Sequence, residues 1–482
     1  MLLLVFWLIG CVAYGQDQDA PEIYRYHVPL PETFSDEWEF QLEVAPISSA
    51  DSYDIKISAH GVQGLELGSW ESGPIGEDGY YIWSSDQVDS ARMANRIQSL
   101  IVQSQARLTG SMWYWSDGIN VMNGVTMPVE VASELVMPHI PSDTFTWLTR
   151  FTIQGISDNP GPGNLIFGYH GQGGSGEQAL NLPVMPNGYA SGAPQFTFNV
   201  GSDDISWGRV KTDTEGFYVA GYQNFLSLSG FLSAALELSS TGAKSGFLGF
   251  SQMEDRDFVD MLAVTNTHNQ DVRARFKLRY HPLNEEGMVS DEVLELSQEQ
   301  VLPAGQRIRL ILGSSLFTGI NGECISLEYE TLPLEDEEDG RAIFVTHLQV
   351  GSEGLSMGGH PQVAELGNKA TTFVDFSGRY KTLIELYSFL GEVNEVTAIL
   401  RNATGDLVAR APIQIAAHDS VALTTDILYN AFADFINPEE SDVYRVDFRG
   451  DGYFLIKQTG MRGDDIGLIN PFMKRVRPDF KQ

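Results

Sequence analysis

The residues best suited to chemistry lie at positions 167–176, Phe-Gly-Tyr-His-Gly-Gln-Gly-Gly-Ser-Gly. A histidine can act as a base, and glycine-rich backbone lets amides approach a developing negative charge. A nucleophile elbow, however, needs serine within Gly-x-Ser-x-Gly, entering a helix directly after a strand. Ser175 is followed at once by Gly176 and then by a run typical of a strand. We therefore interpret the stretch as a strand and hairpin turn. A secreted hydrolase that uses Ser175 or an unidentified pair of acids remains an alternative.

Metal sites have weak support in the sequence. His60, His170 and His281 lie about 110 residues apart, so they would meet only if distant parts of the chain folded together. The run Glu-Asp-Glu-Glu-Asp-Gly at 335–340 places hard oxygen ligands beside a glycine turn, which suits Ca²⁺. It lacks the alternating spacing of an EF-hand, so we interpret it as a solvated loop, with calcium as the alternative. No other cofactor is expected.

Aromatic residues gather at positions 80–83 and 113–115, and the alternation puts Trp113 and Trp115 on one side of a strand. An exposed aromatic row can stack against sugar rings. The candidate ligand-binding residues for such a function are Tyr81, Trp83, Trp113 and Trp115. The simpler interpretation is that the row fills the first core or its junction with the next segment.

A domain-sized period organises the chain. His60, His170, His281 and Asn402 each end a similar alternating run, and their separations are 110, 111 and 121 residues. An alternating apolar pair precedes each of these anchor residues by 18 or 19 positions. A glycine that we expect to turn a hairpin follows each anchor, at Gly110, Gly216, Gly340 and Gly452. Landmarks that recur in the same order indicate tandem duplication.

Period-two runs separated by Gly, Asn, Asp and Pro predict an all-β fold of four tandem β-sandwich repeats of about 110 residues, immunoglobulin-like or fibronectin-like in size. Helical spacing occurs only at 89–105 and 424–435. The predicted units are a signal peptide at 1–15, repeats at 22–137, 138–250, 251–358 and 365–472, and a basic tail at 473–482. Residues 359–361 are expected to be a linker.

The first 15 residues, MLLLVFWLIGCVAYG, are apolar but too short to span a bilayer, and polar residues follow them. They predict a signal peptide cleaved after Gly15, and hence an exported, periplasmic or extracellular protein. In the alternative, Leu-Ile-Gly-Cys at 8–11 is a lipobox, and Cys11 anchors the chain to a membrane through a lipid. The only other cysteine, Cys324, has no partner for an internal disulfide, which favours a bacterial source. No transmembrane segment is expected in the mature chain.

Charge limits the partners. The chain has 30 basic and 64 acidic residues, a formal charge of −34, and so repels nucleic acid. We expect an exported, non-catalytic bacterial repeat protein that acts as an elongated surface or extracellular binding or spacer module. Its partner is an unknown protein or glycan. The alternatives are a carbohydrate-binding accessory protein and a secreted hydrolase.

Overall fold

The computed structural model describes most of the chain between Ile23 and Lys474. The described ranges are 23–30, 38–47, 52–88, 96–116, 121–127, 129–141, 147–171, 174–194, 205–227, 233–250, 258–334, 339–351, 357–361, 363, 365–436, 443–462, 465–469 and 473–474. The predicted signal peptide, Cys11 and most of the predicted basic tail lie outside these ranges. Within them the fold is nearly all β, which confirms the predicted all-β class.

The first pair of sheets is built from residues 24–127. One sheet has the order β1 (Tyr24–Pro29), β8 (Ser99–Ser104), β4 (Ile55–His60) and β5 (Glu66–Glu71). The other has the order β10 (Val121–Met127), β9 (Leu108–Ser116), β2 (Trp38–Pro46) and β7 (Tyr81–Ser84). β3 (Ser52–Tyr53) and β6 (Ile75–Gly76) form a separate two-stranded sheet within the same stretch of sequence. Alternate residues of both sheets, such as Ile57 and Leu42, share one buried core, an arrangement compatible with a β-sandwich.

The second pair of sheets spans residues 134–237 and has its own core, which includes Phe167 and Ile153. Its first sheet has the order β11 (Glu134–Met137), β16 (Trp207–Thr212), β13 (Gly163–Gly171) and β14 (Gly174–Val184). Its second sheet has the order β15 (Tyr189–Gly192), β12 (Trp147–Ile156), β17 (Tyr218–Ser227) and β18 (Ser233–Glu237).

The third pair spans residues 245–361, with Phe276 and Val264 in its core. Its first sheet has the order β19 (Ser245–Gly249), β24 (Gly322–Leu332), β21 (Val272–Pro282) and β22 (Leu294–Leu302). Its second sheet has the order β23 (Arg307–Ile311), β20 (Phe258–Thr265), β25 (Phe344–Gly351) and β26 (Met357–Pro361). The predicted linker at 359–361 is thus wrong, because these residues pair with β25 as part of β26.

The fourth group of strands, residues 367–474, is joined by one long strand, β32 (Val443–Arg462). The N-terminal part of β32 lies between β27 (Gly367–Asp375) and β29 (Asn394–Arg401), and β29 also pairs with β30 (Leu407–Ile415). The C-terminal part of β32 lies between β28 (Lys381–Ser388) and β33 (Asp465–Ile469), and β28 also pairs with β31 (Ser420–Thr424). Met473 and Lys474 of the predicted tail form β34, which pairs with β27.

The anchor residues occupy one structural position. His60, His170 and His281 lie at or near the ends of β4, β13 and β21, and Asn402 directly follows β29. β4, β13 and β21 are each third in a four-stranded sheet, whereas β29 lies between β32 and β30 in the larger sheet of the fourth group. The period found in the sequence therefore marks the end of one particular strand.

The predicted glycine hairpins are wrong. Gly216 lies between β16 and β17, and Gly340 between β24 and β25, but in both cases the two strands belong to different sheets. The chain therefore crosses from one layer to the other instead of turning back within a sheet. Gly110 and Gly452 lie inside β9 and β32. At Gly110 a Cβ atom would come within 2.0 Å of the Glu43 carbonyl oxygen, so close approach of two backbones requires glycine there.

Helix α3 (Thr425–Phe432) confirms helical structure at the start of the 424–435 stretch, and the Thr424 hydroxyl caps it by accepting from the Ile427 N–H. The other stretch with helical spacing, 89–105, allowed either a loop helix or a strand, and its residues 99–104 form β8. Two strands lie before the predicted start of the repeat with which they pair. β11 precedes the predicted start at 138 but pairs with β16 of the second pair of sheets, and β19 precedes the predicted start at 251 but pairs with β24 of the third. No helix in the described ranges is long and apolar enough to cross a membrane.

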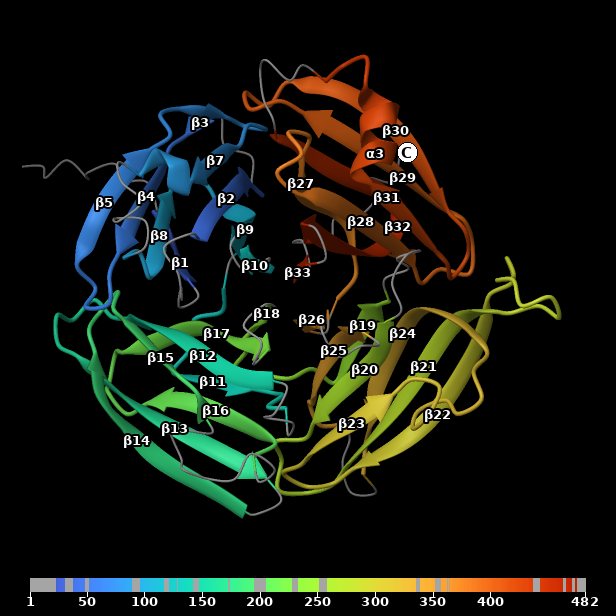
Figure 1. Cartoon of the computed structure of the whole chain (residues 1–482), viewed down its shortest axis with the longest axis horizontal. Helices are drawn as coiled ribbons and strands as arrows, with labels where there is room; N and C mark the ends of the chain where they lie inside the picture. The colour runs from blue at the N-terminus through green and yellow to red at the C-terminus, as the bar shows by residue number, and fades with distance from the viewer. Residues whose placement is uncertain are drawn as a thin grey trace, which may run out of the picture.

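The four groups of strands surround a common centre in the order of the chain, and the first lies beside the fourth (Figure 1). At the centre β10 contacts β18 and β33, and β26 contacts the same two strands. The predicted elongated arrangement is therefore wrong. The closed arrangement depends on contacts between residues hundreds of positions apart, which a local sequence pattern does not contain.

Candidate functional site

The stretch that resembles a hydrolase loop forms a β-hairpin. His170 of β13 lies opposite Ser175 of β14, and Gly171 lies opposite Gly174. The His170 ring stacks on Trp207, with ring centres 4.0 Å apart. Burial and the nearby Arg209 lower the pKa of His170. The strand-and-hairpin interpretation is confirmed for the described residues, and Ser175 does not lie on a strand-to-helix turn.

The structure corrects the predicted aromatic site. Trp83, Trp113 and Trp115 are at most 2% exposed, and Tyr81 is half-buried. The rings of Trp113 and Trp115 lie 5.5 and 6.1 Å from that of Tyr380 in the fourth group of strands. The tryptophans therefore expose no face on which a sugar ring could stack. Trp113 and Trp115 fill a junction, although with the fourth group rather than with the second, whereas Trp83 lies in the first core.

Glu43 organises this junction. The carboxylate is fully buried and accepts four hydrogen bonds. The Oε1 atom accepts from Gln41 Nε2 and from the Tyr380 hydroxyl, both at 2.7 Å. The Oε2 atom accepts from the Ser111 hydroxyl at 2.8 Å and from Trp113 Nε1 at 3.1 Å. Burial raises the pKa of Glu43, and the bonds from Tyr380, Ser111 and Gln41 act in the opposite direction.

The predicted calcium loop lies largely outside the described residues, since only Asp339 and Gly340 of it are described. Asp339 forms an exposed ion pair with Lys244 at 3.0 Å. Among the residues that the structure describes, no cluster of three or more His, Cys, Asp or Glu side chains could hold a metal ion. Cys324 is largely buried beside the third core, and burial raises the pKa of its thiol to about 12. It is therefore a neutral packing residue at physiological pH.

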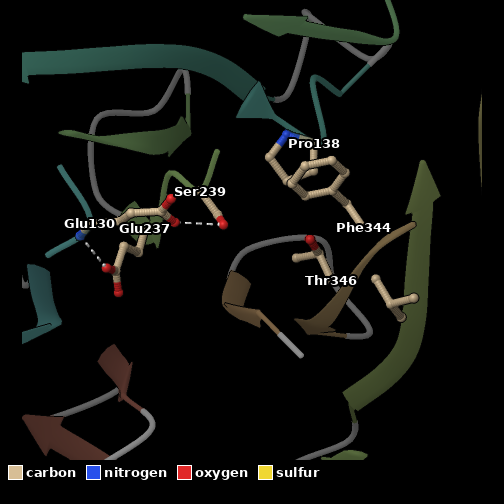
Figure 2. Close-up of a pocket in the computed structure, with 7 residues that line it drawn as sticks. Glu130, Pro138, Glu237, Ser239, Phe344 and Thr346 are labelled. Carbon is tan, nitrogen blue, oxygen red and sulfur yellow. Dashed lines mark hydrogen bonds between the residues drawn. The ribbon is translucent and has the colours of Figure 1, made fainter. Parts of the chain in front are cut away.

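A cavity of about 180 Å³ lies between the second and third pairs of sheets (Figure 2). The residues that line it are Glu130, Pro138, Glu237, Ser239, Phe344, Val345 and Thr346. Glu237 ends β18, whereas Phe344, Val345 and Thr346 begin β25. The carboxyl groups of Glu130 and Glu237 and the Ser239 hydroxyl lie on one side of the cavity, and Pro138, Phe344 and Thr346 lie on the other (Figure 2).

The two carboxyl groups of the cavity have different partners. Glu130 Oε2 accepts from the Ser239 hydroxyl at 2.8 Å, and Oε1 accepts from the Ser240 hydroxyl. Glu237 Oε1 accepts from the backbone N–H of Glu130 at 3.1 Å. Burial, together with the negative charge of Glu130, raises the pKa of Glu237 to about 8, and the N–H bond opposes this rise. Glu237 is therefore largely protonated at neutral pH.

Sequence reasoning did not find this pair. The residues are 107 positions apart, and with 64 acidic residues in the chain any pairing would have been arbitrary. In the sequence, only the position of Glu130 could have pointed to the cavity, because Glu130 lies in the short segment that joins the first and second pairs of sheets. Glu130 and Glu237 come together because that segment passes the end of β18.

The raised pKa of Glu237 predicts how stability changes with pH. Between the ordinary glutamate pKa of 4.5 and the folded-state value of about 8, the folded chain keeps a proton that the unfolded chain loses. The contribution of Glu237 to the free energy of unfolding therefore falls as pH rises through this window. In Glu237→Gln this part of the fall should disappear. Urea unfolding followed by tryptophan fluorescence at pH 5, 6.5 and 8 measures it.

The exposed Glu392 offers a matched control, because Glu392→Gln removes a carboxylate far from the cavity. In this variant the free energy of unfolding should change with pH as it does in the native chain. If the free energy of unfolding of Glu237→Gln also changes with pH as it does in the native chain, this result contradicts the protonated state assigned to Glu237.

No protein-family model matches this sequence, and a search of curated proteins found no significant relative.

Proposed function

We propose that the chain is an exported, non-catalytic bacterial binding module whose four tandem β-sandwich repeats close into a ring. The repeat proposal is supported by the equivalent strand order in the four groups and by the common position of their anchor residues. The export proposal is supported by the N-terminal apolar run. Boundaries would follow the sheets, so that β11 and β19 begin the second and third repeats.

The observation that carries the proposal is the contact between the first and fourth groups. Tyr380 donates to Glu43 across 337 positions of sequence. Arg445 Nη1 donates to the Asp78 carbonyl at 3.0 Å, and the Tyr80 hydroxyl donates to the Val443 carbonyl. A chain of separate domains on flexible linkers would not bury such polar groups between its ends. A closed ring is instead a rigid platform that presents the loops of all repeats at fixed distances.

Every other junction is also made by specific hydrogen bonds. The Tyr114 hydroxyl donates to Asn224 between the first and second groups, at 3.3 Å. Trp207 Nε1 donates to the Gly305 carbonyl between the second and third, at 2.9 Å. The Tyr387 hydroxyl donates to the Phe250 carbonyl between the third and fourth, at 3.0 Å. Such directional bonds fix the angle at each junction, and several weak contacts on a rigid body can add through avidity.

Removal of the Glu43 carboxylate should open the ring. In Glu43→Ala the four buried donors lose their acceptor, which should lower the free energy of unfolding by about 3 kcal/mol or more. Urea unfolding measures this loss, and small-angle X-ray scattering should show a larger radius of gyration.

Tyr380→Phe is the matched comparison, because it removes one hydroxyl and keeps the ring. It should cost about 1 kcal/mol and leave the radius of gyration unchanged. If Glu43→Ala has the native stability and radius, the closed ring does not depend on this junction and the proposal loses its main support.

Export can be tested on the full chain expressed in a bacterium with a C-terminal tag. The protein should be recovered from the periplasm or medium, and its intact mass should correspond to a chain that begins at Gln16. Cys11→Ala should not change its location. A mature chain that begins at a lipid-modified Cys11 and partitions into detergent would support membrane anchoring instead. Retention in the cytoplasm would contradict export.

A further inference from the structure

We propose that the cavity between the second and third pairs of sheets binds a small organic cation. Its ammonium group lies between Glu130 and Glu237, and its hydrocarbon part lies against Phe344 and Val345. This inference rests on the proposed binding function and gives that function a ligand class.

The lining of the cavity matches a ligand with one charged and one apolar end. Glu130, Glu237 and Ser239 provide oxygen atoms on one side, whereas Pro138, Phe344 and Val345 provide apolar surface on the other (Figure 2). Phe344 and Val345 are 5% and 1% exposed, so their positions are fixed by packing around them. A preformed wall of this kind lowers the entropy cost of binding.

Thr346 gives a second, independent sign of a ligand. Its side chain lines the cavity, yet the residue is only 1% exposed. Within the described ranges its hydroxyl has no hydrogen-bond partner, and the oxygen is open to the cavity rather than fully enclosed. A hydroxyl group can both donate and accept, so this oxygen favours a polar group beside it in the cavity. A ligand N–H group in the cavity would provide a donor for the Thr346 oxygen.

The polar groups of the cavity favour a cation over other ligands. They are carboxyl and hydroxyl oxygens, and no residue that is described in the lining carries a positive charge. The formal charge of −34 on the chain attracts cations and repels anions. A volume of about 180 Å³ is several times that of one water molecule, so the cavity has room for a short carbon chain beside the ammonium group.

The protonation of Glu237 couples binding to pH. Among the described residues that line the cavity, Glu130 is the only other titratable one. Its negative charge and burial keep Glu237 largely protonated near pH 7. An ammonium group placed between the two carboxyls favours the ionised form of Glu237, so binding should release a proton to the solvent. Affinity should therefore increase as pH rises from 6 to 8.5.

The test uses the native mature chain and n-butylammonium chloride as the probe, in calorimetric titrations at constant ionic strength. Saturable binding is expected, with proton release visible as a dependence of the heat on the buffer. n-Butanol has the same carbon chain without the charge and should bind at least ten-fold more weakly. Calcium chloride tests the other cation class, and butyrate tests an anion.

Three variants make the assignment specific. Glu237→Gln should weaken n-butylammonium binding about ten-fold and abolish the proton release. Thr346→Val keeps the shape of the side chain and should weaken binding by a smaller factor, roughly three-fold to ten-fold. Glu392→Gln, at the exposed surface of the fourth group, should bind as the native chain does.

The outcomes separate this inference from the function on which it rests. Equal binding of n-butanol, binding of calcium alone, or unchanged affinity in Glu237→Gln would overturn the organic-cation site. No binding by a native chain whose scattering shows a closed ring would also overturn the site and leave the ring proposal intact. An open ring in the native chain would instead contradict the proposed function itself.

Discussion

The buried carboxylate of Glu43 is the constraint on which the closed arrangement depends. A charge removed from water is costly unless it is fully compensated, and this carboxylate has four donors within 3.1 Å. Three donors come from the first group of strands and one, Tyr380, comes from the fourth. Full compensation therefore requires that the two ends of the chain meet. An apolar junction of similar area would hold the first and fourth groups together but would fix the angle between them less well.

Polar contacts recur around the ring beside small apolar clusters, such as the one that Phe225, Leu236, Ala263 and Leu348 form between the second and third groups. The main cores are apolar and mostly lie within single pairs of sheets, whereas fully buried polar side chains gather where the groups meet. Lys457, which is not exposed, donates to Gln349 of the third group at 3.3 Å. Burial lowers the pKa of Lys457, and the charges of Glu385 and Asp260 oppose that effect. Directional polar contacts give each junction one preferred geometry.

Local sequence patterns predicted what local physics determines. Alternation indicated strands, the anchor residues marked one strand end, and Thr424 marked the start of a helix. Some failures were local, as at the four glycines expected to turn hairpins, and others concern what covers the second face of a strand. Gln41, Glu43, Trp113 and Trp115 lie on faces turned away from the first core. Alternation alone describes such faces as exposed, but the fourth group of strands covers them.

The candidate cavity was hidden from the sequence for a related reason. Glu130 and Glu237 meet only because the segment after β10 passes the end of β18, and Thr346 arrives from the third group. Turn chemistry correctly described the stretch around His170, where β13 and β14 are neighbours in sequence and pair with each other. Prediction was therefore reliable for most strands, failed for the glycine hairpins within each group, and was weak wherever two groups share a surface.

Three glutamates show how the surroundings decide the role of one residue type. Glu43 has four donors and acts as a structural acceptor. Glu130 accepts from two serine hydroxyls, and Glu237 has one N–H donor beside a second carboxyl group. Arg273 and Arg275 pair with Glu299 at 2.9 Å. Since self-repulsion at a charge of −34 opposes the compact state, a cation from solution is the simplest way to complete the Glu130–Glu237 site.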